Sequence, residues 1–128
     1  MASALFTQDA PAALGPYSQA VKISAASEVI FVSGQIPLTP NGELVSGTIA
    51  QELATALSNV QAILREAGAT LENVVKSTIF LSDMEDFSEA NEEYLRWFKW
   101  DLKPARSCVA VKQLPKNARV EVECIARV

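Results

Sequence analysis

The 128-residue sequence contains no histidine and only two cysteines. Without histidine the chain cannot form a Ser-His-Asp triad, a Cys-His pair or a histidine-ligated zinc site. Acid–base chemistry near neutral pH is therefore left to carboxyl, thiol, lysine and tyrosine groups, or to the substrate itself. The two cysteines, Cys108 and Cys124, do not have CxxC spacing, and they are too few for a metal cage or a disulfide-rich scaffold.

The sequence also has no excess of positive charge, because its net charge at pH 7 is −4. A general nucleic-acid binder needs a basic face to offset the phosphates, so the composition argues against a nucleic-acid partner. No apolar run approaches the roughly 20 residues that a membrane span needs. Residues 1–9 lack the basic and apolar regions of a signal peptide. We expect a cytoplasmic protein with no membrane partner.

The composition is that of an ordinary globular protein, with 49% hydrophobic and 20% charged residues. The length suits one domain, so residues 1–128 are predicted to form a single unit. Residue patterns predict strands over Tyr17–Ser24, Glu28–Ser33 and Asn73–Ser82, and two more strands in the last quarter. Apolar residues that recur every three or four positions predict helices over Thr48–Ala67 and from Asp86 to about Trp100.

This order of elements predicts an α/β (α+β) fold in which one mixed β-sheet carries two helices on one face. Many of the predicted strands carry apolar residues on both of their faces. The face of the sheet without helices therefore needs a cover, and oligomerisation through that face is the simplest way to provide it.

Charged residues interrupt two apolar, strand-like runs near the C-terminus. The first run holds Arg106 and Cys108, the second holds Glu121 and Glu123, and a short proline-containing turn joins them. If the two strands are neighbours, a guanidinium and a carboxylate lie close enough to bind and turn over a small carboxylate-bearing molecule. The alternative is an edge-strand arginine in solvent or in a structural ion pair, with glutamates that only keep the edge soluble.

Other polar residues at the ends of elements are weaker candidates. Cys108 is either a packed wall residue or a nucleophile whose thiolate Arg106 would favour, but no histidine can act as its base. Tyr17, Ser33 and Asn91 are structural or site residues, and Gly34 could expose backbone N–H groups to an anion. Cys124 lies on the face of its strand opposite to Glu121 and Glu123, and it is predicted to belong to the core.

Several segments resemble the reactive-intermediate deaminase (RidA/YjgF) family over nearly the whole chain. The matching segments are 10–20, Val32–Pro37, Asn73–Lys76, Asp86–Phe87 with Asn91, and 104–126. The resemblance implies a fold similar to bacterial chorismate mutase and a homotrimer with a cleft at each subunit interface. It also implies hydrolysis of 2-imino acids such as 2-iminobutanoate and 2-iminopropanoate, and of their enamine tautomers, to 2-keto acids and ammonia.

The same resemblance implies roles for single residues. Arg106 would grip the substrate carboxylate, and Glu121 would handle the proton of the attacking water or the departing nitrogen. The cleft would be lined by Tyr17, Ser33, Gly34, Asn91 and Cys108. An iminium carbon is already electrophilic, so the reaction needs no metal, cofactor or covalent nucleophile, and none is expected.

Two other functions stay open at this stage. The cleft could belong to a non-catalytic protein that binds 2-keto acids or related carboxylates, although a pure anion binder gains nothing from Glu121. Some relatives are described as ribonucleases or translation inhibitors, which the acidic composition and the missing histidine disfavour. Some relatives are also mitochondrial, and the preferred imino acid is not evident from the residues.

Overall fold

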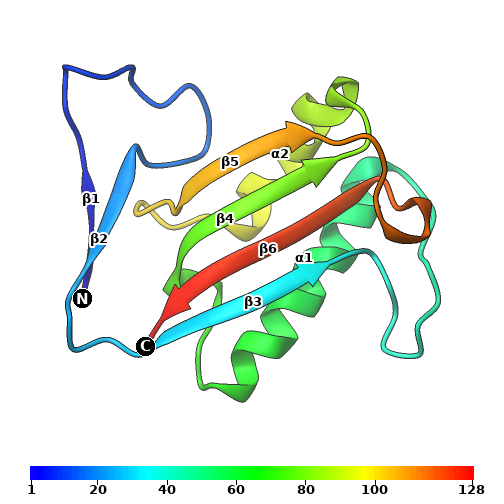
Figure 1. Cartoon of the computed structure of the whole chain (residues 1–128), viewed down its shortest axis with the longest axis horizontal. Coiled ribbons are helices and arrows are strands. Elements are labelled where there is room, and N and C mark those ends of the chain that lie inside the picture. The colour runs from blue at the N-terminus through cyan, green and yellow to red at the C-terminus, as the bar shows by residue number, and fades with distance from the viewer.

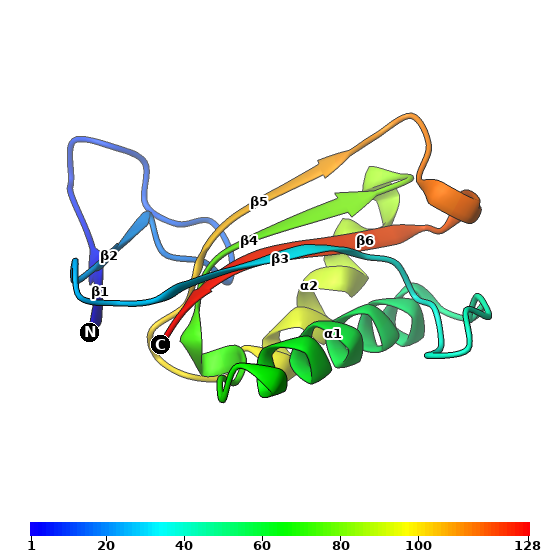
Figure 2. The same cartoon turned by 60° about the horizontal axis from the view of Figure 1, so that its bottom comes forward.

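The computed structural model describes all residues, 1–128, and its centre is a four-stranded mixed sheet (Figure 1). The strand order is β3-β6-β4-β5, with β4 and β5 parallel and the other pairs antiparallel. The strands are β3 (Val29–Gln35), β4 (Val74–Leu81), β5 (Ala105–Ala110) and β6 (Val120–Arg127). Two helices, α1 (Ile49–Glu66) and α2 (Phe87–Trp97), lie on one face of this sheet, and the other face is bare (Figure 2). The predicted fold class is thus confirmed.

The order of the last two strands differs from our expectation. A short turn that includes the 3-10 segment η3 (Pro115–Asn117) links β5 to β6, yet β4 lies between them. The two strands bearing Arg106 and Glu121 are therefore not neighbours. A parallel β4–β5 pair forms because α2 carries the chain across the sheet between these two strands, as parallel pairing requires.

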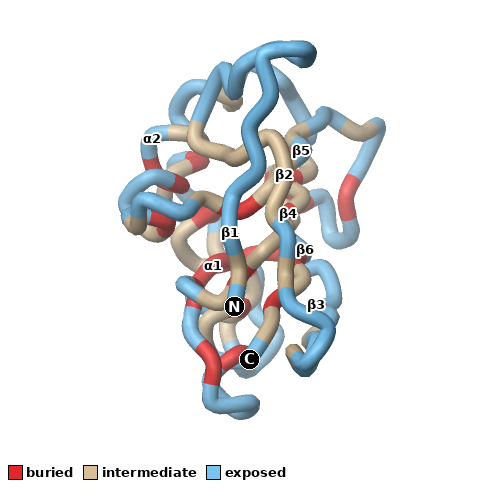
Figure 3. Tube along the Cα trace, turned by 90° about the vertical axis from the view of Figure 1, so that its left-hand side faces the viewer, coloured by how far each residue is buried: buried red, intermediate tan, exposed pale blue.

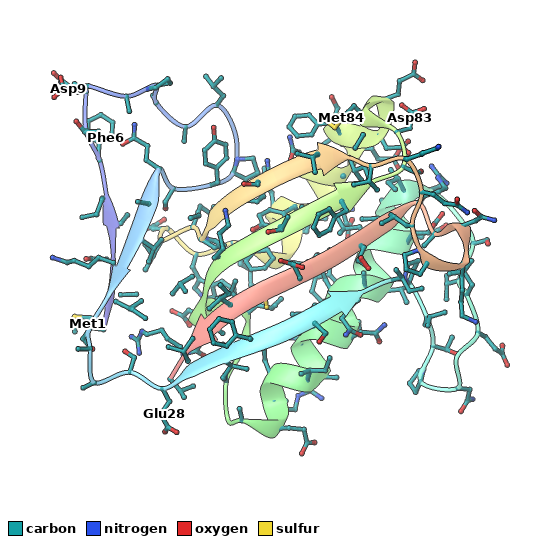
Figure 4. The ribbon with its side chains drawn as sticks, viewed as in Figure 1. Met1, Phe6, Asp9, Glu28, Asp83 and Met84 are labelled. Atoms are coloured by element: carbon teal, nitrogen blue, oxygen red, sulfur yellow. The ribbon has the colours of Figure 1, made fainter.

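The N-terminal strands form a separate ribbon outside the main sheet. β1 (Ala2–Leu5) pairs antiparallel with β2 (Ala20–Ile23), and Figure 3 shows this ribbon as exposed or half-buried. In Figure 4 Phe6 and Asp9 lie on the arm beyond β1, far from the sheet. The predicted strand in Tyr17–Ser24 is present as β2. No strand was predicted for Ala2–Leu5, because this short segment has no alternating apolar pattern.

α1 begins as its residues predict. Thr48 Oγ1 accepts the backbone N–H of Gln51 at 3.1 Å, and the Gln51 side chain accepts the N–H of Thr48 at 2.9 Å. α1 buries one apolar stripe against the sheet, and its largest members are fully enclosed: Ile49, Leu53, Leu57, Val60 and Leu64. α2 ends at Trp97, earlier than predicted. Neither helix has the length and apolar character that a membrane crossing requires.

The alternation along β4 separates the two faces of the sheet. Ser77, Ile79 and Leu81 are completely buried beneath the helices, whereas Phe80 faces the uncovered side and is only half-buried. On that side Phe31 of β3 is 76% exposed. The uncovered face is thus partly apolar, as the sequence predicts.

Candidate functional site

Arg106 lies on the helix-covered face of β5, under the inner side of α2. Its Nη1 donates to Oδ1 of Asn91 at 2.7 Å. Three aromatic rings surround the guanidinium carbon, with centroids at 5.0 Å for Tyr94, 5.7 Å for Tyr17 and 5.8 Å for Phe87. All three are within the range of cation–π attraction. This environment is not that of an edge arginine in solvent.

One donor of Arg106 is left without a partner. Its Nε is buried and makes no hydrogen bond, although an unsatisfied buried donor costs roughly 1 to 3 kcal/mol. A cavity of about 330 Å³ adjoins the side chain, and its wall consists of Leu14, Gly15, Tyr17, Phe87, Arg106 and Cys108. An arginine that lines a small, partly apolar cavity and keeps one donor unpaired suits the carboxylate of a small molecule.

The loop that carries Tyr17 is tied to the start of β5. The Ser18 side chain donates to the Lys103 carbonyl, and the Ser18 backbone N–H donates to the Pro104 carbonyl at 3.1 Å. Tyr17 itself accepts the N–H of Leu14 with its hydroxyl at 3.2 Å. These bonds hold the Tyr17 ring beside Arg106, although the two residues are far apart in the sequence.

The thiol of Cys108 shares the face and the cavity of Arg106. Burial raises its pKa, and the nearby Arg106 guanidinium opposes this rise without cancelling it. The thiol is therefore protonated at neutral pH, which argues against a nucleophile and for a wall residue. Burial and the neighbouring Glu123 raise the pKa of Cys124 to about 12, as expected for a core thiol.

Ser33, Gly34 and Glu121 form a second group on the uncovered face. Gly34 lies where the β3–β6 register shifts, beside the Glu121 carboxyl. A Cβ placed on Gly34 would lie 2.7 Å from Cδ of Glu121, closer than real Cβ contacts. Because Gly34 has no side chain, the Glu121 carboxyl group can occupy this space.

The arginine group (Tyr17, Asn91, Arg106 and Cys108) and the glutamate group (Ser33, Gly34 and Glu121) are on opposite faces of the sheet. Arg106 pairs with Ser77 on β4, and Glu121 pairs with Phe80, three residues further along the same strand. Side chains alternate along a strand, so an offset of three residues changes the face. The two strands are also two spacings apart, or roughly 10 Å. The expectation that Arg106 and Glu121 adjoin within one chain is therefore wrong.

Sequence reasoning missed part of the surroundings of Arg106. Tyr94 and Phe98 belong to the hydrophobic core, but the rings of Phe87 and Tyr94 also lie over the guanidinium. The available signal was the spacing of Phe87, Asn91 and Tyr94, which puts them on one face of a helix. The partner of that face was not predictable from the spacing.

Known proteins match this chain over almost its whole length. Residues 7–128 match the family described as Endoribonuclease L-PSP. A RutC family protein of Pyrococcus abyssi is 47% identical over 95% of this chain and 94% of its own length. The 2-iminobutanoate/2-iminopropanoate deaminase of Mus musculus is 47% identical over 94% of this chain and 87% of its own length.

Among solved structures, E. coli TdcF with bound serine superposes with a TM-score of 0.72 at 38% identity, covering 97% of both chains. Sequence and structure thus agree on one family. The chain belongs to the Endoribonuclease L-PSP family, the RidA/YjgF group of proteins that its motifs resemble.

Proposed function

We propose that this protein is a deaminase that hydrolyses 2-imino acids, such as 2-iminobutanoate and 2-iminopropanoate, to 2-keto acids and ammonia. The observation that carries the proposal is the buried, unpartnered Nε of Arg106 beside a small cavity with apolar walls. The relatives named as deaminases, at 46 to 47% identity, support the same activity.

Arg106 binds the substrate carboxylate in this proposal. Asn91 occupies Nη1, so Nε and Nη2 form the edge that remains for a bidentate pair with the two carboxylate oxygens. The apolar wall of Leu14 and Phe87 then accommodates a short alkyl side chain. Binding in this way fixes the imine carbon in space and leaves the reaction with water as the step to be catalysed.

Glu121 manages the protons in this mechanism. As a carboxylate it accepts a proton from water while the water oxygen bonds to the imine carbon and the C=N π electrons move to nitrogen. With the imine in its protonated, iminium form, Glu121 returns this proton to nitrogen and then accepts the proton of the new hydroxyl group, so the C–N bond breaks as the carbonyl forms and ammonia leaves. A positioned acid–base group of this kind contributes about 10²- to 10⁴-fold in rate.

The site also needs more than one protomer. Arg106 and Glu121 are on opposite faces of one sheet, so we propose that the arginine group of one protomer meets the glutamate group of its neighbour in a homotrimer. The exposed Phe31 and the half-buried Phe80 on the uncovered face supply apolar area for that contact. We also propose a cytoplasmic location, in keeping with the free thiols of Cys108 and Cys124.

Substitution of Arg106 tests the activity. Arg106→Ala should abolish the acceleration of keto-acid release when a dehydratase generates the imine, because the variant no longer holds the carboxylate. Arg65→Ala, which removes an exposed arginine in the last turn of α1, is the matched control and should behave like the wild type. Unchanged acceleration by an Arg106→Ala protein of unaltered oligomeric state would overturn the assignment.

A second candidate is a carboxylate-binding protein without catalysis, which is favoured by the serine bound to the TdcF neighbour. Glu121→Gln separates the two functions. In a deaminase it reduces kcat and leaves carboxylate binding intact, whereas in a pure binder the wild type already releases no extra ammonia. An endoribonuclease, the activity in the family's description, is less well supported because the net charge of −4 provides no overall attraction for phosphates.

A further inference from the structure

Tyr94 has the closest aromatic ring to Arg106 and is completely buried. Its ring centroid is 5.0 Å from the guanidinium carbon, nearer than those of Tyr17 and Phe87. The ring also stacks on Phe98, with centroids 4.3 Å apart and planes inclined by 20°. Packing of this kind holds the ring in one orientation beneath the guanidinium.

The hydroxyl of Tyr94 is fastened to the strand next to Arg106. It lies 2.7 Å from Oγ of Ser77, and this hydrogen bond is buried. Ser77 is the residue of β4 directly opposite Arg106 in the β4–β5 register. The Tyr94 hydroxyl is therefore hydrogen-bonded to Ser77, the residue beside Arg106, and Arg106 is the side chain that the ring supports.

Tyr94 interacts with Arg106 as a neutral ring. Burial raises the pKa of Tyr94 to about 12, although the Ser77 hydrogen bond and the Arg106 charge oppose the rise. The phenol thus carries no charge at neutral pH and has no part in proton transfer there. Its attraction for the guanidinium comes from the negative face of the ring.

We infer that Tyr94 is a positioning residue for Arg106, and that Ser77 is the anchor that keeps its ring in place. The inference rests on the proposed function. The guanidinium carbon lies over the Tyr94 ring and Asn91 holds Nη1, so the Nε and Nη2 edge keeps one direction. A preset guanidinium loses less side-chain entropy when the carboxylate binds.

The competing explanation is that Tyr94 only fills the core. In that case its replacement lowers the free energy of unfolding without affecting carboxylate affinity in the folded protein. Leu57→Ala provides the matched control, since Leu57 is a completely buried residue of α1 whose truncation also opens the core.

The experiment measures kcat and KM for an enzymatically generated imine, and Kd for pyruvate by calorimetry, on the assembled protein. Tyr94→Leu should raise both KM and Kd about three- to thirtyfold, the loss expected for a cation–π contact. We expect kcat to stay within about twofold, because the carboxylate is gripped equally in the ground and transition states. Leu57→Ala should change neither KM nor Kd, and pyruvamide, which lacks the carboxylate, should bind weakly to every variant.

The anchor has its own test, which also serves if Tyr94→Leu does not fold. Tyr94→Phe and Ser77→Ala each remove one side of the hydroxyl pair and keep the ring at position 94. Each should raise Kd about two- to fivefold, a fraction of one hydrogen bond. The double variant should bind no more weakly than either single one, because both changes remove the same interaction.

The outcomes separate the inference from the proposed function. If the wild type neither hydrolyses imines nor binds pyruvate, the proposed function fails and the inference falls with it. If the wild type does both, and all three Tyr94 and Ser77 variants keep wild-type KM and Kd, only the positioning role is wrong. A rise in Kd for Leu57→Ala equal to that for Tyr94→Leu would likewise assign the effect to core packing.

Discussion

Arg106 has surroundings that a strand arginine in solvent does not have, with three aromatic rings within 6 Å and one buried donor unpaired. The rings attract the guanidinium, whereas the unpaired donor is costly unless something binds it. Glu121 is placed by a different device, the absence of a side chain on Gly34. Both candidate residues thus depend on a neighbour that performs no chemistry.

Gly34→Ala tests this dependence at the second residue. The added methyl group needs the space of the Glu121 carboxyl, so the carboxyl must move. Because a displacement of about 1 Å can cost 10²-fold, we expect kcat for imine hydrolysis to fall about 10- to 100-fold. KM should change little, since the arginine group is untouched.

The double variant Gly34→Ala with Glu121→Gln provides the control for this effect. If the glycine acts through the carboxyl, the double variant should be no slower than Glu121→Gln alone. A Gly34→Ala protein with wild-type kcat would show that the carboxyl tolerates displacement or is not used.

The secondary-structure elements meet at a second arginine, away from the candidate site. Arg119, just before β6, donates to Glu52 of α1 at 3.1 Å, to Asp86 at the start of α2 at 3.4 Å, and to the Gly47 carbonyl at 2.9 Å. Its bonds join the beginnings of both helices to the sheet. Because α2 carries Asn91 and Tyr94, this connection helps to fix the helix above Arg106.

Arg119→Ala should lower the free energy of unfolding by about 2 kcal/mol, because it leaves the Glu52 carboxylate, only 4% exposed, without its partner, while the 41% exposure of Arg119 itself weakens the pair. Denaturant unfolding of the wild type and the variant measures the difference. Glu52→Gln in the same background should recover part of the loss by removing the buried charge. Equal stability of Arg119→Ala and the wild type would show that solvent compensates the carboxylate.

At the scale of the whole molecule, the sheet separates the two halves of the proposed site. The arginine group opens toward the helix side, and the glutamate group faces the uncovered side seen in Figure 2. In the proposed trimer, one protomer would therefore present each half to a different neighbour. An assembly of identical chains joins such halves by repeating one contact around an axis.

Mixed assemblies test this arrangement directly. Arg106→Ala and Glu121→Ala proteins should each be inactive alone. After they are unfolded together in equal amounts and refolded, about one quarter of the sites should combine an intact arginine with an intact glutamate. We therefore expect about one quarter of the wild-type kcat per site in the imine assay.

The control is the same mixture assembled without an unfolding step, which should stay inactive as long as subunits do not exchange. No recovery of activity in refolded, correctly assembled mixtures would mean that the two residues act within one chain or not at all. Light scattering on the wild type provides the companion measurement, and a monomer at micromolar concentration would contradict the proposed trimer.

Local patterns were sufficient for much of the fold. The Thr48–Gln51 capping box and the apolar stripe that follows it predict the start and the buried face of α1, because both depend on residues three or four positions apart. The alternation in β4 and β6 likewise predicts strands. The missing histidine excludes whole classes of mechanism, and the C-terminal motif identifies Arg106 and Glu121 as candidates.

The arrangement of those elements is not a local property. Nothing in β5 or β6 specifies that β4 lies between them, because a strand's hydrogen-bonding groups are the same whichever partner they meet. That order leaves Arg106 and Glu121 far apart in one chain, and the register of their strands on β4 puts them on opposite faces. It also brings Ser77 and Tyr94 to Arg106 from different elements. The candidate residues Arg106 and Glu121 can therefore be predicted from the sequence, whereas their neighbours in space follow from the long-range packing of the sheet against α2.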